Sequence, residues 1–481
     1  MASVSTTHPL LHDTDGAGPA AAALIHRGLG LVSLVAWLSL LWEVKALIGW
    51  RGVDPAQTLL ISLRASDPNL SFWSFPSHIF FDASDTSIVA GCIVGAALSA
   101  VATLGRWPRL MLPLSAALYL GYCFAARAFL SFQWDSLLIE ASVLAALLAG
   151  SRGDRAGWLA VRLLLFKLFF ESGISKWQSA IGDWRDGSAM AHYYETSPLP
   201  TPLAWYAHHL PPAWHTLESW ATLVFELVLV WGIFGGRGPK RVALAAVFGF
   251  LVLDGLTSNY GFFLILTAVL AISLVSESTA ARVCHTLRIR PHPDTPGGPL
   301  RHVRGALVLL WALLSLQAGL ARFGGIQIMP ELRSRLAAYR VVNEYHLFAS
   351  VTRTRHEPEI QSSPDGQAWT AHALHHKPGP PDRAPSWVAP HQPRLDFRLW
   401  FHGLSWQRKT PPYVATLLGR VCHDPDAVQM FFADPLPPSD TTQFVRIVYW
   451  DHQLSPWDSD VWWTRTEVDT TRAIPCAQLR G

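Results

Sequence analysis

Residues 158 to 177 read WLAVRLLLFKLFFESGISKW, an apolar run that contains Lys167 and Glu171. A helix rises about 1.5 Å per residue, so roughly 20 apolar residues cross the hydrocarbon core of a bilayer, which is about 30 Å thick. We therefore expect residues 158 to 174 to span a membrane. Lys167 and Glu171 are four residues apart on one helical face, so they could neutralise each other.

Eight further runs of this kind flank the first one. Half of the chain is hydrophobic, only 15% is charged and the mean hydropathy is +0.22, whereas an ordinary globular domain is about 25% charged. We therefore predict a polytopic α-helical membrane protein with about nine transmembrane helices. The other eight runs lie near residues 29 to 49, 87 to 105, 110 to 128, 133 to 150, 216 to 235, 241 to 257, 259 to 276 and 304 to 322.

The basic residues of the connecting segments predict the orientation. Cytoplasmic loops carry an excess of Lys and Arg, and counting from a cytoplasmic N-terminus makes every inside loop basic. The opposite connections, residues 129 to 132 and 257 to 260, contain no Lys or Arg. The basic residues are Arg106 and Arg109, then Arg152 and Arg155, then Arg237, Lys240 and Arg241, and finally Arg282, Arg288, Arg290, Arg301 and Arg304.

Four segments follow from this topology. Residues 1 to 24 are rich in Ala, Gly, Ser and Thr and lack the pattern of a signal peptide, so we expect a disordered tail. Residues 25 to 322 form the transmembrane domain, which includes an extracytoplasmic loop rich in Pro and aromatic residues at 175 to 215. An odd number of spans places residues 323 to 481 outside the cytoplasm as a soluble, strand-rich α+β domain.

The exported domain carries its own turn and strand signals. Pro364-Asp365-Gly366 separates two short alternating segments, 359 to 362 and 368 to 374, which is typical of a β-hairpin. A second strand pair is predicted at residues 444 to 450 and 461 to 467, and helical spacing at residues 395 to 403 and 413 to 421.

Composition excludes several classes of function. A net charge of +3 is too small to indicate nucleic-acid binding. The five cysteines have neither a CxxC spacing nor that of metal ligands, so we expect no metal site, no thiol redox motif and no cofactor. Cys422 and Cys476 could form a disulfide if their domain is exported.

Ionisable residues in the apolar segments are the better guide to function. Such groups are costly inside a membrane, so they are usually paired or line a polar cavity. Two interpretations stay open, which are structural pairs between helices and a cavity that serves substrate or proton movement. The residues are Asp135, Glu140, Lys167, Glu171, Glu218, Glu226 and Asp254.

The loop at residues 175 to 215 contains further candidates for chemistry. Its prolines prevent one continuous helix. His192, Glu195 and His208 are residue types that ligate metals or act as acids and bases, although such residues in an interfacial loop also cap helices and recognise partners. Together with Lys167 and Glu171, these three residues are the catalytic candidates.

Several motifs together resemble the lipase maturation factor family. In the membrane half they are residues 133 to 140 (QWDSLLIE), 167 to 176, 192 to 196 (HYYET), 200 to 208 (PTPLAWYAH) and 259 to 263 (NYGFF). In the exported domain they are residues 343 to 348 (NEYHLF), 365 to 369 (DGQAW) and 387 to 396 (WVAPHQPRLD).

The resemblance implies a membrane protein that helps lipases to fold and assemble, in the endoplasmic reticulum of animals. It also implies a membrane half distantly similar to that of the vitamin K-dependent γ-carboxylase, of which no catalytic residue can be carried over. The Ala, Arg and Trp bias of this chain suggests a bacterial-type member in an inner membrane. The expected partners are secreted or membrane client proteins, with lipases as the clients that the resemblance implies, and membrane lipid.

Two hypotheses for function remain. In the first, the chain is a folding factor whose exported domain binds clients through five residues. Alternatively, Arg394 pairs with Asp396 and merely holds a loop against the sheet. In the second hypothesis, an intramembrane enzyme acts on a lipid-like substrate in a cavity bounded by Lys167, Glu171, Glu226 and the loop from 192 to 208. The five client-binding candidates are Trp387, His391, Arg394, Asp396 and Trp400.

Overall fold

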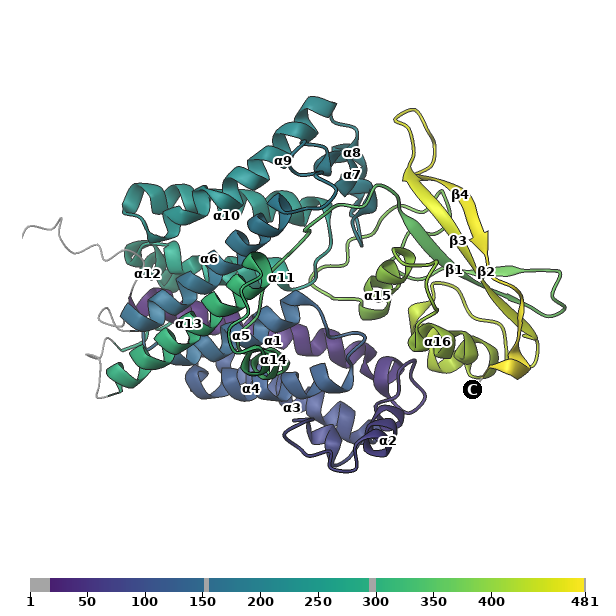
Figure 1. Cartoon of the computed structure of the whole chain (residues 1–481), viewed down its shortest axis with the longest axis horizontal. Coiled ribbons are helices and arrows are strands. Elements are labelled where there is room, and N and C mark those ends of the chain that lie inside the picture. The colour runs from purple at the N-terminus through teal and green to yellow at the C-terminus, as the bar shows by residue number, and fades with distance from the viewer. Residues whose placement is uncertain (1–17, 151–154, 294–299, 480–481) are drawn as a thin grey trace, which may run out of the picture.

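A computed structural model describes residues 18–150, 155–293 and 300–479. It has a helical part, residues 18–324, and a part built around one antiparallel sheet, residues 341–479 (Figure 1). These are called the helical part and the sheet part below. Residues 1–17 of the predicted tail lie outside the described residues, but the tail prediction is wrong for residues 19–24, because helix α1 begins at Pro19.

Nine helices carry the apolar runs. Each predicted span falls on one of them, because each run is long enough to form several helical turns. The helices are α1 (Pro19–Ile48), α3 (Asp85–Thr103), α4 (Pro108–Ala125), α5 (Gln133–Leu147), α6 (Arg155–Trp177), α9 (Pro212–Leu227), α10 (Arg237–Thr257), α11 (Phe263–Ala271) and α13 (Arg301–Gly324).

Only four helical segments in the described part are both long and apolar enough to cross a membrane. Helix α5 has 15 residues and α11 has 9, and α6 carries several charged residues along its length. The prediction of about nine spans is therefore not confirmed, although the membrane class is supported. The four segments are Pro19–Ile48, Asp85–Thr103, Pro212–Phe234 and Arg301–Gly324.

Four shorter helices complete the helical part, and a fifth, α14 (Pro330–Ala338), lies between the two parts. The predicted loop at 175 to 215 contains two of them, and residues 197–201 separate these two. Pro202 begins the second of them, where a missing N–H costs no hydrogen bond, and Thr201 Oγ1 caps it by accepting Leu203 N–H. The five are α2 (Ala56–Ser66), α7 (Ala189–Thr196), α8 (Pro202–His208), α12 (Glu277–Thr286) and α14 (Pro330–Ala338).

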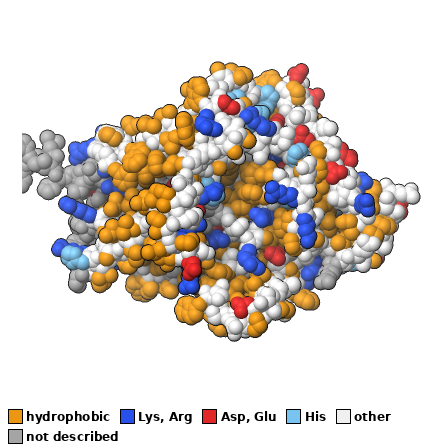
Figure 2. Space-filling model, viewed as in Figure 1, with side chains coloured by type: hydrophobic (Ala, Val, Ile, Leu, Met, Phe, Trp, Pro, Cys, Tyr) orange, Lys and Arg blue, Asp and Glu red, His pale blue; other side chains and the backbone are white. Residues whose placement is uncertain are grey.

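The outer surface of the helical part is apolar. Figure 2 shows hydrophobic side chains over much of these helices and charged side chains toward the sheet. On α13, for example, Leu309 is 61% exposed and Leu316 is 60% exposed. Contiguous exposed apolar surface of this extent indicates contact with lipid rather than water.

The sheet has the strand order β2-β1-β3-β4, all antiparallel, and β5 also pairs with β3. Both predicted strand pairs are confirmed. Gly366, with φ of +77°, lies in the first hairpin's turn, where a residue without a Cβ is favoured. The strands are β1 (His356–Ser363), β2 (Thr370–His372), β3 (Phe444–Leu454), β4 (Trp463–Thr470) and β5 (Ile474–Pro475).

Two helices pack on the sheet, α15 (Arg394–Gly403) against β1 and α16 (Pro412–His423) against β3. Both were predicted from their apolar spacing. At Gly403, the last residue of α15, the helix comes close to the backbone of β1. A Cβ at this position would lie only 2.0 Å from the carbonyl oxygen of His356, so the close approach requires glycine. The sheet part therefore has the predicted α+β composition.

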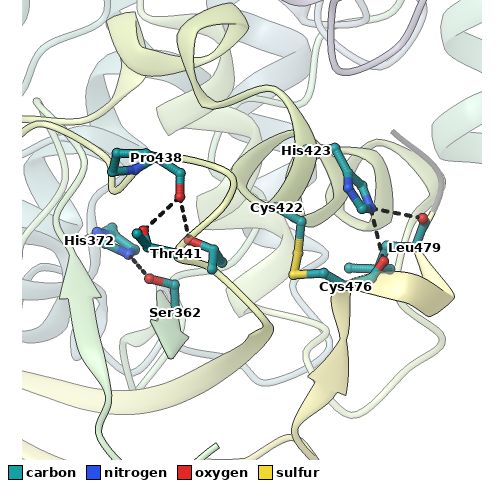
Figure 3. Close-up of a disulfide and its surroundings, with 9 residues drawn as sticks. Ser362, His372, Cys422, His423, Pro438, Thr441, Cys476 and Leu479 are labelled. Carbon is teal, nitrogen blue, oxygen red and sulfur yellow. Dashed lines mark hydrogen bonds between the residues drawn. A yellow bond between two sulfur atoms is a disulfide. The ribbon is translucent and has the colours of Figure 1, made fainter. Parts of the chain in front are cut away.

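A disulfide joins Cys422, at the end of α16, to Cys476, which follows β5 (Figure 3). Beside it, His423 Nε2 lies 2.9 Å from the carbonyl oxygen of Cys476 and 3.2 Å from that of Leu479. The disulfide and this histidine hold the C-terminal segment against α16.

Cys422→Ser should lower the free energy of unfolding of the sheet part by about 4 kcal/mol, because the disulfide closes a loop of 54 residues in the unfolded chain. The measurement is denaturant unfolding of the purified protein, followed by tryptophan fluorescence. Cys284→Ser, which changes a free buried thiol of the helical part, is the control. An unchanged unfolding curve for Cys422→Ser would contradict the expectation.

Candidate functional site: the polar junction of the two parts

Arg394, the first residue of α15, joins the sheet part to the helical part. Its guanidinium donates to both carboxylate oxygens of Asp135, at 2.9 Å each, and to the Tyr119 hydroxyl at 2.8 Å and the Phe129 carbonyl at 3.0 Å. The side chains of Arg394 and Asp135 are both 0% exposed. Paired donation of this kind gives a strong, directional contact.

The expected pairing of Arg394 with Asp396 is therefore wrong. Two residues apart on a helix do not face each other, and Asp396 instead accepts the His376 N–H at 3.1 Å. Sequence reasoning missed Asp135 as the partner because the two residues are 259 positions apart.

Helix α1 contributes a second set of contacts. Glu43 accepts the backbone N–H of Arg394 at 3.0 Å and lies 3.0 Å from His391 Nε2. Ser39 Oγ lies 2.9 Å from His391 Nδ1 and accepts the Gln392 N–H at 2.9 Å. Serine hydrolases use the same order of hydroxyl, imidazole and carboxylate, but Ser39 lies within α1 and its oxygen already accepts a backbone N–H. We interpret the group as an anchor for the segment before α15.

Asn259 makes a third contact between the parts. Its side-chain oxygen accepts the N–H groups of Val388 and Ala389 at 2.8 and 3.0 Å. Asn259 begins a turn that contains Gly261, with φ of +53°, where a Cβ would meet Gln392 of the sheet part. This turn therefore binds the sheet part.

Glu140 lies at the centre of a fourth group. Its oxygens accept from Lys167 Nζ at 2.8 Å, Trp311 Nε1 at 2.9 Å, the Tyr345 hydroxyl at 2.6 Å and Asn343 Nδ2 at 2.8 Å. The expected pair of Lys167 with Glu171 is therefore wrong, since Lys167 faces Glu140. Asn343 and Tyr345 follow the last membrane-type helix, so Glu140 holds the chain where it enters the sheet part.

The predicted single cavity is divided by α6. Lys167 and Glu171 line a cavity of about 520 Å³ between α6 and α13. Glu226 lines a different cavity of about 320 Å³ between α6, α7, α9 and α10, together with Lys176. Lys167 and Glu171 of α6 therefore line one cavity, and Glu226 of α9 lines the other, so the three residues do not converge on one substrate.

Of the three loop candidates, Glu195 contacts the sheet. Glu195 accepts the Leu454 N–H at 2.9 Å and lies 4.0 Å from His208 Nε2. Burial raises the pKa of Glu195, and burial followed by repulsion from His209 lowers the pKa of His208 to about 4, so the imidazole is neutral at pH 7. His192 is half-buried on α7. Across the described ranges, no group of three or more His, Cys, Asp or Glu side chains is placed to bind a metal.

Sequence reasoning missed two basic residues beside Glu357 of β1, and one of them, Arg355, joins the same loop to this strand. Arg355 donates to the carbonyl oxygens of Glu195 and Pro198 at 2.9 Å each, and its side chain lies 2.7 Å from Glu357. Lys377 lies 2.5 Å from the other oxygen of Glu357. Neither position stands out in the sequence, because isolated basic residues in a strand-rich region are usually exposed.

The five client-binding candidates do not form one surface. Trp387 is 57% exposed and His391 is half-buried, whereas Arg394 and Asp396 are buried, at 0% and 2%. Trp400 is half-buried and donates its Nε1–H to the Thr196 carbonyl. Arg394 and Asp396 thus contact the rest of the chain, and their side chains are covered from a client.

Two family models match the chain. The "Lipase maturation factor transmembrane domain" matches residues 20–282, and the "Lipase maturation factor C-terminal domain" matches residues 341–473. The chain belongs to the lipase maturation factor family.

Curated relatives in animals extend the match over most of the chain. Lipase maturation factor 2 of Homo sapiens is 27% identical over 93% of this chain and 81% of the relative. Lipase maturation factor 2 of Gallus gallus is 28% identical over 83% and 72%, and lipase maturation factor 1 of Bos taurus is 27% identical over 89% and 83%. No solved structure matches the chain.

The junction lies between the two lipase maturation factor domains. Glu43, Asp135 and Asn259 belong to the matched transmembrane domain, and His391 and Arg394 belong to the matched C-terminal domain. The contacts between them are direct hydrogen bonds of buried or half-buried groups. The family's two domains therefore form one connected unit in this chain.

Asp396 makes the stability of the C-terminal domain dependent on pH. Burial, reinforced by the nearby Glu43, raises its pKa to about 7. Between about pH 4 and pH 7 the folded protein holds a proton that the unfolded chain releases, so stability falls as the pH rises through this window. Asp396→Asn should therefore be more stable than the wild type at pH 8, and the difference should shrink toward pH 4. Thermal unfolding of the purified protein from pH 4 to pH 8 measures this.

The matched control is Asp382→Asn, which removes an exposed carboxylate from the same domain. Its pH profile should follow that of the wild type. If Asp396→Asn were less stable than the wild type by the same amount at pH 8 and at pH 4, the assignment of this pH dependence to Asp396 would be contradicted.

Proposed function

We propose that this chain is a membrane-anchored maturation factor that assists the folding or assembly of secreted or membrane proteins, lipases among them. The names of its relatives support this role. The architecture is consistent with it, because a membrane-type helical part carries a folded domain through buried polar contacts. Catalysis is not required for this activity.

The proposed topology has nine membrane helices, a cytoplasmic N-terminus and the C-terminal domain on the opposite side, in a bacterial inner membrane. The disulfide between Cys422 and Cys476 supports an oxidising compartment for that domain. Figure 2 shows Lys and Arg side chains at the end of the helical part farthest from the sheet, which agrees with a cytoplasmic position for that end.

The observation that carries the proposal is an exposed aromatic surface where α8 meets the β3–β4 hairpin of the C-terminal domain. It consists of Tyr206 and Trp457, which are 49% and 63% exposed and whose ring centroids lie 6.0 Å apart. We call it the Trp457 surface. Exposed Trp and Tyr side chains are the residue types that dominate binding energy at protein interfaces. A partly folded client presents apolar surface that such a patch can cover.

Both parts of the molecule build the Trp457 surface. Trp457 lies in the β3–β4 hairpin and stacks on Trp205 of α8, with ring centroids 4.9 Å apart. The indole N–H of Trp205 points toward the carbonyl and hydroxyl oxygens of Ser455, at 3.2 and 3.1 Å. The patch is therefore held at a fixed position relative to the membrane helices, as expected for a rigid binding site.

Trp457→Ala should reduce the yield of active secreted lipase from a host in which this gene is the only source of the factor. Removing one interface tryptophan costs about 2 kcal/mol, which weakens client binding roughly thirty-fold. The measurement is lipase activity per mass of secreted lipase, at equal amounts of the factor in the membrane.

Trp73→Ala is the matched control, because Trp73 is 74% exposed on the segment between α2 and α3, away from the sheet in Figure 1. A photoreactive residue placed at position 457 should crosslink the lipase, and one at position 73 should not. Full activity with Trp457→Ala, or equal crosslinking at both positions, would contradict the proposed site.

A further inference from the structure

A cavity of about 320 Å³ lies between α6, α7, α9 and α10 and has no part in the Trp457 surface. We propose that it binds a single-chain amphiphile with a head group that donates hydrogen bonds, an alcohol or an amine. The inference does not depend on client binding. It rests on an apolar end, a polar end whose lysine and tyrosine donors are already occupied, and a lateral opening.

The apolar end suits a hydrocarbon chain. Phe225 of α9, Phe169 of α6 and Phe250 of α10 pack against one another, with ring centroids 4.7 to 5.8 Å apart. Leu229 and Ala246 extend the same lining. Ligand sites are mostly apolar with a few convergent polar groups, and they begin at about 300 Å³. This cavity has that size and that lining.

At the polar end of the cavity, all three N–H donors of Lys176 are already used by acceptors of the protein. Lys176 Nζ donates to both oxygens of Glu226, at 2.8 and 2.9 Å, and to the Leu347 carbonyl at 3.0 Å. An ammonium group has three donors. The one cation that lines the cavity is therefore saturated by the protein, among the residues described.

The tyrosine hydroxyls are also engaged with carboxylates. Tyr193 donates to Asp254, and Tyr194 donates to Glu218 at 2.9 Å. A carboxylate can accept several hydrogen bonds at once, so both acids keep the capacity to accept from a ligand. Asp254 is only half-buried although helices surround it, because it lines the cavity. The wall thus offers acceptors to a bound molecule.

Charge selects against acidic head groups. Three carboxylates, those of Glu218, Glu226 and Asp254, and one ammonium group, that of Lys176, line the polar end, which leaves two formal negative charges when all are ionised. Like charges repel strongly where water is excluded. A fatty acid or a phosphate ester therefore fits poorly, whereas a hydroxyl or an ammonium group finds acceptors.

The cavity has the orientation of a lipid in a bilayer. Its polar end lies beside the segment that enters the C-terminal domain, where Trp184 donates to the Phe348 carbonyl at 3.0 Å. Its apolar end lies deeper among the helices, near Phe169, two turns earlier on α6 than Lys176. Leu253 both lines the cavity and is 58% exposed, so the cavity reaches the lipid-facing surface there.

The test uses the full chain in phosphatidylcholine nanodiscs with three probes, dodecylamine, dodecanol and dodecanoic acid, each with a diazirine near the chain end. After irradiation, peptide mass spectrometry locates the label. The amine and the alcohol should label the peptides that contain Phe225 and Phe250 at least about five-fold more than the acid does. Asp254→Asn should reduce labelling by the amine more than labelling by the alcohol.

Ala246→Trp fills the cavity and should abolish labelling at these peptides. Ala312→Trp, in the other cavity beside α13, is the matched control and should leave labelling unchanged. Equal labelling by all three probes would overturn the proposal, because it would indicate lipid contact without selection. Unchanged labelling in Ala246→Trp would overturn it as well. So would a loss of amine labelling in Asp254→Asn that is no larger than the loss of alcohol labelling.

Discussion

The ion pair between Arg394 and Asp135 is the contact on which the arrangement of the two parts depends. A charge buried without its partner costs several kcal/mol, so the guanidinium can stay inside only while the carboxylate lies against it. Because Arg394 is the first residue of α15, fixing its side chain also fixes the direction in which that helix leaves the membrane half. Because the sheet packs on α15, its position relative to the membrane half is fixed as well.

Around this pair, most of the unusual polar residues serve to join the two domains. Glu43, Glu140 and Asn259 each bind backbone or side-chain groups of the C-terminal domain. The interpretation of membrane charges as structural pairs therefore accounts for these residues. The carboxylates of the cavity between α9 and α10 are different, because Asp254 and Glu218 retain unused acceptor capacity beside an open space.

Local pattern was enough to predict elements, and it was not enough to predict partners. The apolar runs located the helices, and Pro364-Asp365-Gly366 located the first hairpin, because both signals act over a few residues. The pairs Lys167 with Glu171 and Arg394 with Asp396 were wrong, since the true partners are 27 and 259 positions away. Of the site, sequence identified Arg394 and His391 as important positions, but it could not show that Arg394 is buried or that Trp457 stacks on a loop residue 252 positions earlier.

The most direct test of this account is a double-mutant cycle between Arg394 and Asp135. The free energy of unfolding is measured in detergent for Arg394→Met, Asp135→Leu and the double variant. The account predicts a loss of about 3–5 kcal/mol for each single variant, and a double variant that is less destabilised than the sum by more than about 2 kcal/mol. Additive losses of less than about 1 kcal/mol each would contradict the claim that this pair holds the two domains together.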